Sequence, residues 1–211
     1  SCNSLTKIED PKTIEYWQTN ADETLKLQKQ NNLVFDNPQN NFQNILINPS
    51  EKFQTVDGFG YTLTGGSVEV INQLSPAKKK ELLQDIFGKS EQSIGVSYLR
   101  LSIGASDLNS SVFSYDDVPA GQTDEDLSEF SLAKDQPVID MLKEILAINP
   151  DIKIIAAPWS PPVWMKDNGN SIGGSLKTEY YQVYAEYFVK YIQEMKKNGI
   201  TIDAITPQNE P

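Results

Sequence analysis

The chain ends in Asn209, Glu210 and Pro211, which place an amide and a carboxyl group directly after a short apolar stretch. At the mouth of a parallel strand, such a glutamate can deliver a proton while the neighbouring amide holds a hydroxyl group. Cleavage of a glycosidic bond needs a proton donor for the departing oxygen and a second carboxylate for the oxocarbenium-like transition state. Asn209 and Glu210 are therefore candidates for a site that cleaves glycosides.

The composition of the chain favours carboxylate chemistry on a neutral ligand. The sequence contains no histidine, which excludes Ser-His-Asp and Cys-His machinery and the commonest metal ligand. A net charge of −11, from 29 acidic and 18 basic residues, disfavours nucleic acids and anionic membranes. No apolar run is long enough for a transmembrane segment. A neutral partner such as a carbohydrate fits this negatively charged protein better than an anionic partner does.

Strand-like and helix-like segments alternate along the chain. Ser75 followed by Pro76 is typical of a helix start, and Gly88 is typical of the stop that follows. We expect strands at residues 14–19, 45–47, 53–56, 95–103, 152–157 and 202–206, and helices at 76–87, 136–148 and 177–197. Asp135 is expected to cap the second of these helices, and the tyrosines of the third, which recur at helical spacing, are expected to fill the core. From residue 53 on, this alternation predicts a parallel α/β fold, either an open doubly wound sheet or a closed (β/α)8 barrel.

Both architectures gather ligands at the carboxyl ends of the strands. Polar and aromatic residues follow each expected strand of this part, at residues 57–60, 104–107, 158–162 and 207–211. The glycines of the first group do not continue into a nucleotide-binding loop, because Leu63 stands where the third glycine is required. Trp159 offers a face on which a sugar ring can stack, whereas we interpret Trp164 as packing. Arg100, inside an apolar strand, needs a partner such as a carboxylate at the strand ends.

These motifs together resemble glycoside hydrolase family 30, which includes lysosomal glucosylceramidase and microbial β-1,6-glucanases. The most specific run is residues 157–166, Ala-Pro-Trp-Ser-Pro-Pro-Val-Trp-Met-Lys, followed by Gly-Gly-Ser-Leu at 173–176 and Asn-Glu-Pro at 209–211. Gly-Phe-Gly at 58–60 and the segment 100–107 stand in the matching order. The resemblance covers nearly the whole chain from Glu15 on.

The resemblance implies a role for five residues and no metal or cofactor. Glu210 would be the general acid/base, and Asn209 would bind the 2-hydroxyl of the cleaved sugar. Trp159 and Asp107 would hold the more remote hydroxyls, and Arg100 would orient the nucleophile. The family's nucleophile is a glutamate after strand seven of the barrel, so we expect it outside these 211 residues and expect the 211-residue chain alone to be inactive.

The resemblance also implies a (β/α)8 barrel with an accessory β-sandwich at its side. We predict a leader or linker at 1–13, strands of the sandwich at 14–52, and the first half of the catalytic barrel, with four strands, at 53–211. Cys2, after the small Ser1, resembles the lipidated cysteine of an exported bacterial lipoprotein; an unmodified Cys2 is the alternative. The expected location is the periplasm or the outer cell surface, with a lipid anchor at Cys2.

The expected activity is that of a retaining β-glycosidase acting on glucose-type β-linkages, in β-1,6-glucan, a β-glucoside or a glucosylceramide-like substrate. Asp107 and Trp159 match the glucosylceramidase-like branch of the resemblance. The main alternative is a non-catalytic carbohydrate-binding lipoprotein, which has the same polar residues after its strands but lacks the nucleophile. A purely structural domain is disfavoured, because polar groups follow every strand.

Overall fold

The computed structural model describes residues 12–35, 40–43 and 45–210, and the chain divides into two units between Gln54 and Thr55. In the first unit, β1 (Thr13–Ile14) pairs with β4 (Leu33–Val34), and β2 (Trp17–Gln18) pairs with β3 (Gln28–Lys29). Both pairs are antiparallel. The predicted lipid anchor at Cys2 lies outside the described residues, and the mass of the purified N-terminus would check it.

The three strands predicted between residues 14 and 56 differ from the structure. The stretch 14–19 is interrupted, since it contains Ile14 of β1 and the whole of β2, and the residues at 45–47 and 53–56 form no strand. Ile45, Ile47 and Phe53 are each more than four-fifths exposed, so no partner strand or covering layer buries them. A short apolar run favours a strand only where a second strand and a covering layer are present. The accessory β-sandwich stays a prediction.

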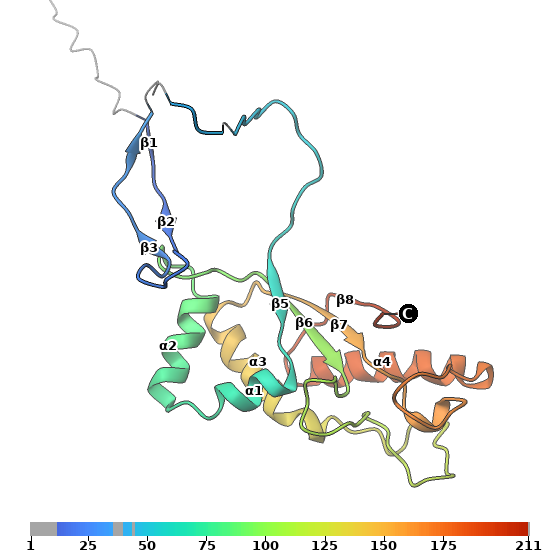
Figure 1. Cartoon of the computed structure of the whole chain (residues 1–211). Coiled ribbons are helices and arrows are strands. Elements are labelled where there is room, and N and C mark those ends of the chain that lie inside the picture. Colours follow the sequence, from blue (N-terminus) through green and yellow to red (C-terminus); the bar gives the residue numbers. More distant parts are fainter. Residues whose placement is uncertain (1–11, 36–39, 44, 211) are drawn as a thin grey trace, which may run out of the picture. The chain divides into compact units, whose positions relative to one another are not determined.

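The second unit is built on a four-stranded parallel sheet in the order β5-β6-β7-β8 (Figure 1). The strands are β5 (Gly60–Thr62), β6 (Tyr98–Ile103), β7 (Lys153–Pro158) and β8 (Ala204–Ile205). The first barrel strand therefore begins later than predicted, and residues 57–59 lead into it instead of following it. A Cβ on Gly60 would lie 1.6 Å from the Tyr98 carbonyl oxygen, so the absence of a side chain lets β5 approach β6.

Four helices follow the pattern expected for crossovers between parallel strands. They are α1 (Gly65–Ile71), α2 (Pro76–Phe87), α3 (Gln136–Ile148) and α4 (Tyr181–Lys197). Ser75 caps α2 as predicted, since its side chain accepts from the Lys78 amide at 3.4 Å. Asp135 does not cap α3, because its carboxylate accepts the hydroxyl of Tyr115 instead. Helix α1 was not predicted; the Thr64 side chain caps it.

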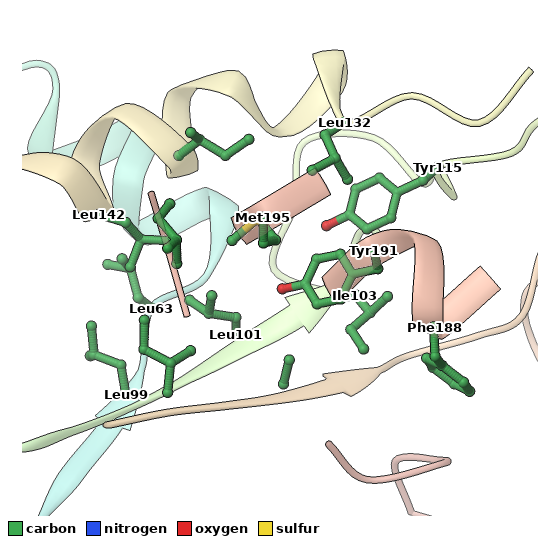
Figure 2. Close-up of a cluster of buried hydrophobic side chains, with 14 of the residues drawn as sticks. Leu63, Leu99, Leu101, Ile103, Tyr115, Leu132, Leu142, Phe188, Tyr191 and Met195 are labelled. Atoms are coloured by element: carbon green, nitrogen blue, oxygen red, sulfur yellow. The ribbon is translucent and has the colours of Figure 1, made fainter. Parts of the chain in front are cut away.

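The helices cover one face of the sheet and leave the other face to polar groups. Along β6, Leu99, Leu101 and Ile103 are buried, whereas Arg100 and Ser102 are only half-buried. Figure 2 shows the buried members together with side chains of α3 and α4, including Leu142 and Tyr191. Each such leucine or isoleucine contributes about 1.5–3 kcal/mol of burial free energy. This alternation places the guanidinium of Arg100 on the face that the helices do not cover.

The long connection between β6 and α3 is held by aromatic packing. Tyr115 stacks on Tyr191 of α4 with ring centroids 5.6 Å apart, and its amide donates to the hydroxyl of Tyr187 at 3.1 Å. The Trp164 indole donates to the Asp116 carbonyl at 3.0 Å and is almost fully buried, which confirms its interpretation as packing. The connection is therefore packed against α4 and Trp164 as an ordered part of this unit.

Asp116 is a buried carboxyl group without a hydrogen-bond partner in the part of the chain that the structure describes. Its side chain has no exposed surface, and neither carboxyl oxygen finds a donor there. Burial, together with the nearby Asp124 carboxylate, raises the pKa of Asp116 to about 7, although Lys190 on α4 acts in the opposite direction. Because an isolated charge is costly in such a place, the neutral acid is the form that suits the fold.

Asp116→Asn is expected to stabilise the protein at alkaline pH. Because the pKa of Asp116 is raised in the folded protein, the stability of the fold is greatest below about pH 4, where Asp116 is neutral in both the folded and the unfolded state. This stability is lost as the pH rises through about 7, where the buried carboxyl group ionises. At pH 8 the neutral amide should therefore increase the free energy of unfolding by about 2 kcal/mol, which is several degrees in Tm. Calorimetry at pH 4 and pH 8 measures this. The exposed Asp126, in the same connection, provides the control variant Asp126→Asn. An equal effect of Asp116→Asn at both pH values would contradict the prediction.

Candidate active site

The register of the sheet places a set of polar side chains on its uncovered face. Thr62 of β5 pairs with Arg100 of β6, and Ser102 of β6 pairs with Ala157 of β7. Residues paired across a parallel sheet point to the same side, so these four share one face. Arg100 is the only arginine of the 211-residue sequence.

A cavity of about 220 Å³, here called the inner cavity, opens on this face and at the carboxyl ends of the strands. All five residues predicted to act on a sugar line it: Arg100, Asp107, Trp159, Asn209 and Glu210. They come from four different segments of the chain, the farthest of them 110 positions apart in sequence. The structure thus brings together every predicted site residue of the second unit.

Arg100 and Asn209 are joined directly. The guanidinium of Arg100 donates to the side-chain oxygen of Asn209 over 2.6 Å. The sequence led us to expect a carboxylate as the partner of Arg100, and in the described residues the partner is this amide. A guanidinium has donors only, so the bond fixes which end of the amide faces Arg100. The Asn209 side-chain nitrogen is left to donate to a ligand.

Glu210 is exposed and stands in an uncommon backbone conformation. Its φ angle is 45°, in the left-handed region that residues other than glycine seldom adopt. The preceding Gln208 donates to the Trp159 carbonyl at 3.4 Å and to the Asn209 carbonyl at 3.1 Å. Residues after β8 are thereby tied to the residue that follows β7. A conformation of this kind is frequent where the backbone aims a functional side chain.

Four polar residues of the inner cavity were not among the predicted site residues. They are Thr62, Thr64, Ser102 and Ser106. Ser102 could have been found, because it stands two positions after Arg100 and side chains two apart in a strand share a face. Thr62 could not, because β5 was expected several residues earlier. The hydroxyl of Thr64 is already engaged with the start of α1, where it accepts from the Ser67 amide at 3.1 Å.

A second cavity of about 850 Å³, here called the outer cavity, shares Trp159, Asn209 and Glu210 with the first. The rest of its lining comes from residues 161–176, from the first two turns of α4 and from residues 207–208. Tyr181 of α4 is more than half exposed and lines it, so the prediction that Tyr181 fills the core was wrong. The other α4 tyrosines, at 184, 187 and 191, are buried as predicted, and Tyr184 also lines the cavity. Glu210 therefore stands where two cavities of different size meet.

The described residues contain no cluster of three or more acidic, histidine or cysteine side chains with a geometry suited to a metal ion. None of the described helices combines the length and the apolarity needed to cross a membrane.

Comparisons with known proteins agree with this geometry. The sequence profile of the Glycosyl hydrolase family 30 TIM-barrel domain matches residues 56–211. An endo-1,6-β-D-glucanase of Neurospora crassa is 39% identical over 169 residues, which are 77% of this chain and 35% of that protein. Lysosomal acid glucosylceramidase of Mus musculus is 34% identical over 175 residues, which are 79% of this chain and 33% of that protein.

Solved structures show the same relationship. An endo-β1,6-glucanase superposes with a TM-score of 0.75 at 37% identity, over 93% of this chain and 42% of that one. SrfJ from Salmonella typhimurium superposes with a TM-score of 0.82 at 28% identity, over 93% of this chain and 44% of that one. The chain spans about a third of the length of the curated relatives that it matches. The predicted barrel fold, with its first four strands, is confirmed.

Proposed function

Because the chain belongs to glycoside hydrolase family 30, we propose that it carries the acid/base half of the active site of a retaining β-glycosidase. The observation that carries the proposal is the inner cavity, in which Glu210 and Asn209 lie together with Arg100, Asp107 and Trp159. A proton donor, a hydroxyl-binding amide and an aromatic face all serve the cleavage of a sugar, which requires a second carboxylate as well.

The proposed reaction has two steps that both use Glu210. In the first step, Glu210 donates a proton to the glycosidic oxygen while a second carboxylate attacks the anomeric carbon and the leaving group departs. In the second step, Glu210 takes a proton from water, which hydrolyses the glycosyl-enzyme intermediate. Retaining enzymes hold the two carboxyl groups about 5 to 5.5 Å apart. Asn209, oriented by Arg100, donates to the 2-hydroxyl of the sugar in both steps.

We propose that the second carboxylate comes from residues outside the described part of the chain. Among the described residues that line the two cavities, Asp107 is the only other carboxylate, and we assign it to the hydroxyls of the sugar. The 211-residue chain is then inactive by itself, whereas the full-length protein hydrolyses β-glycosides. Measured turnover of an aryl β-glucoside by the purified 211-residue chain would contradict this assignment.

Glucose-type β-linkages are the proposed substrates, because the relatives include both endo-1,6-β-glucanases and glucosylceramidases. The deciding experiment assays the full-length protein on β-1,6-glucan, other β-glucans, an aryl β-glucoside and glucosylceramide. Hydrolysis of at least one of them, with retention of the β-configuration by NMR, is the expected result. Saccharide binding without any turnover would favour the alternative, a non-catalytic carbohydrate-binding protein.

A further inference from the structure

Asp107, which we assign to the hydroxyls of the sugar, lies on a four-residue turn shortly after β6, here called the 106–109 turn. The backbone closes this turn, because the Asn109 amide donates to the Ser106 carbonyl at 3.1 Å. Asp107 is exposed and lines the inner cavity. An exposed carboxylate on a turn keeps one direction only if the turn itself is fixed, so the groups that fix the turn also direct Asp107.

The Asn109 side chain closes the 106–109 turn a second time. Its Oδ1 atom accepts from the Ser106 amide at 2.9 Å and from the Ser106 hydroxyl at 3.3 Å. The same hydroxyl accepts from the Leu108 amide at 3.2 Å. Asparagine and serine side chains commonly fix turns in this way. Because Ser106 is buried, the loss of the Asn109 oxygen would leave its amide without this acceptor in a place that water barely reaches.

The 106–109 turn lies against the first two residues of α1, Gly65 and Gly66. A Cβ on Gly65 would lie 2.1 Å from the Nδ2 atom of Asn109, and a Cβ on Gly66 would lie 2.1 Å from the Leu108 carbonyl oxygen. Neither glycine has a positive φ angle, so the backbone conformation alone would accept other residues. The two glycines are therefore required for the close approach of the turn to α1.

Ser110 continues this contact one turn further along α1. Its hydroxyl donates to the Glu69 carboxylate at 2.8 Å, between residues 41 positions apart. Thr64, whose side chain caps α1, lines the inner cavity together with Asp107. The start of α1 and the 106–109 turn are thus packed together beside the inner cavity, through contacts made entirely within the second unit.

We propose that Asn109 is a positioning residue for Asp107: packed on Gly65 and Gly66, it holds the 106–109 turn so that the carboxylate faces the sugar. This inference rests on the function proposed above and adds to it the groups that direct Asp107. Asn109 lines neither the inner nor the outer cavity, so it acts through Asp107 and not on the sugar. A carboxylate held in place before the sugar arrives loses less conformational freedom on binding.

Asn109→Ala in the full-length protein should lower kcat/KM on β-1,6-glucan about 10-fold, as for the loss of one hydrogen bond. Asn109→Asp keeps an acceptor for the Ser106 amide and should retain most of the activity. Because Asn109 acts through Asp107, adding Asn109→Ala to Asp107→Ala should cause little further loss. Independent losses that multiply in the double variant would overturn the proposal, as would an Asn109→Asp variant as slow as Asn109→Ala.

Gly65→Ala separates the direction of Asp107 from the stability of the fold. The added methyl group meets the end of the Asn109 side chain, which can turn aside, and alanine is the better helix former, so Tm should not fall. The value of kcat/KM should nevertheless fall as in Asn109→Ala, and Gly65→Ala should have no further effect once Asn109 is alanine. A Gly65→Ala variant with the kcat/KM of the wild type would contradict the role of Asn109.

Asn149→Ala is the matched control for Asn109→Ala. The Asn149 side chain also fixes a turn, since it accepts from the Asp151 amide at 3.3 Å. This turn precedes β7, at the end of the strand opposite the cavities, and Asn149 lines neither of them. The control should keep the kcat/KM of the wild type even if its Tm falls. A loss of activity equal to that of Asn109→Ala would show that both act through stability, and the proposal would fail.

A binding measurement separates this inference from the proposed reaction. Calorimetry with a β-1,6-linked oligosaccharide, in a Glu210→Gln background that prevents hydrolysis, should show Kd about 10-fold higher after Asn109→Ala or Gly65→Ala. If the wild type hydrolyses no substrate but this dependence of Kd is present, the hydrolase proposal fails and the role of Asn109 stands. If hydrolysis is present but neither variant changes kcat/KM or Kd, the role of Asn109 fails alone.

Discussion

Glu210→Gln in the full-length protein is expected to lower kcat on β-1,6-glucan by about 10³-fold, within the range observed for loss of a general acid/base. Glutamine keeps the size and the hydrogen-bonding reach of the side chain but cannot deliver or accept the proton. A sugar leaving group depends strongly on that proton, because a free alkoxide leaves poorly. A nitrophenolate leaves without help, so the first step should be affected less on an aryl β-glucoside. Initial rates on the two substrates measure the difference.

Chemical rescue distinguishes an acid/base from a residue that only shapes the cavity. In Glu210→Ala, azide can attack the glycosyl-enzyme intermediate without a general base, so added azide should restore turnover of the aryl glucoside and yield a β-glycosyl azide. Glu125→Gln, at an exposed position of the connection before α3, is the control and should behave as the wild type. A Glu210→Gln variant that retains more than a tenth of the glucan activity would contradict the assignment.

Arg100→Met and Asn209→Ala are each expected to lower kcat/KM by about 10²-fold, as for loss of a hydrogen bond that involves a charged group. The physical reason is their shared bond of 2.6 Å, which turns the Asn209 amide so that its nitrogen faces the sugar. Because Arg100 acts through Asn209, the double variant should lose little more than either single variant. Full additivity of the two losses would show that Arg100 acts on another group.

A substrate without the 2-hydroxyl tests the role of Asn209 itself. On a 2-deoxy-β-glucoside the wild type should be slow, and Asn209→Ala should be nearly as fast as the wild type, because the hydroxyl that the amide would bind is missing. If Asn209→Ala loses as much on the 2-deoxy substrate as on the normal one, Asn209 does not bind the 2-hydroxyl. The folded state of each variant is checked by its Tm.

The sequence alone determined the elements whose cause is local. Ser75, Pro76 and Gly88 fix α2 because a cap, a preset φ angle and a stop act within one turn of a helix. The apolar runs of β6 and β7 and the stripe of α4 are also local patterns. The segment 100–107, the motif at 157–166 and the final Asn209-Glu210 pair were sufficient to indicate the family and to name five of the residues that line the inner cavity.

The strands near the N-terminus show where local patterns fail. Residues 45–47 and 53–56 carry apolar residues on both sides of a turn, as two strands would, but pairing needs a partner that only the fold can supply, and these residues form no strand. The first barrel strand was predicted at 53–56, but β5 starts at Gly60, where the backbone approaches Tyr98 closely. That contact joins segments 38 positions apart, so the local sequence could not indicate it. Asp135 looked like a helix cap, yet Tyr115, 20 positions away, takes its carboxylate.

Only the tertiary structure decided which groups of the site touch and what lies beside it. The bond from Arg100 to Asn209 spans 109 positions, and no spacing rule could have indicated an amide in place of a carboxylate. Residue types and order thus determined what chemistry the protein could perform at Glu210. The packing of distant segments determined the two cavities that meet there.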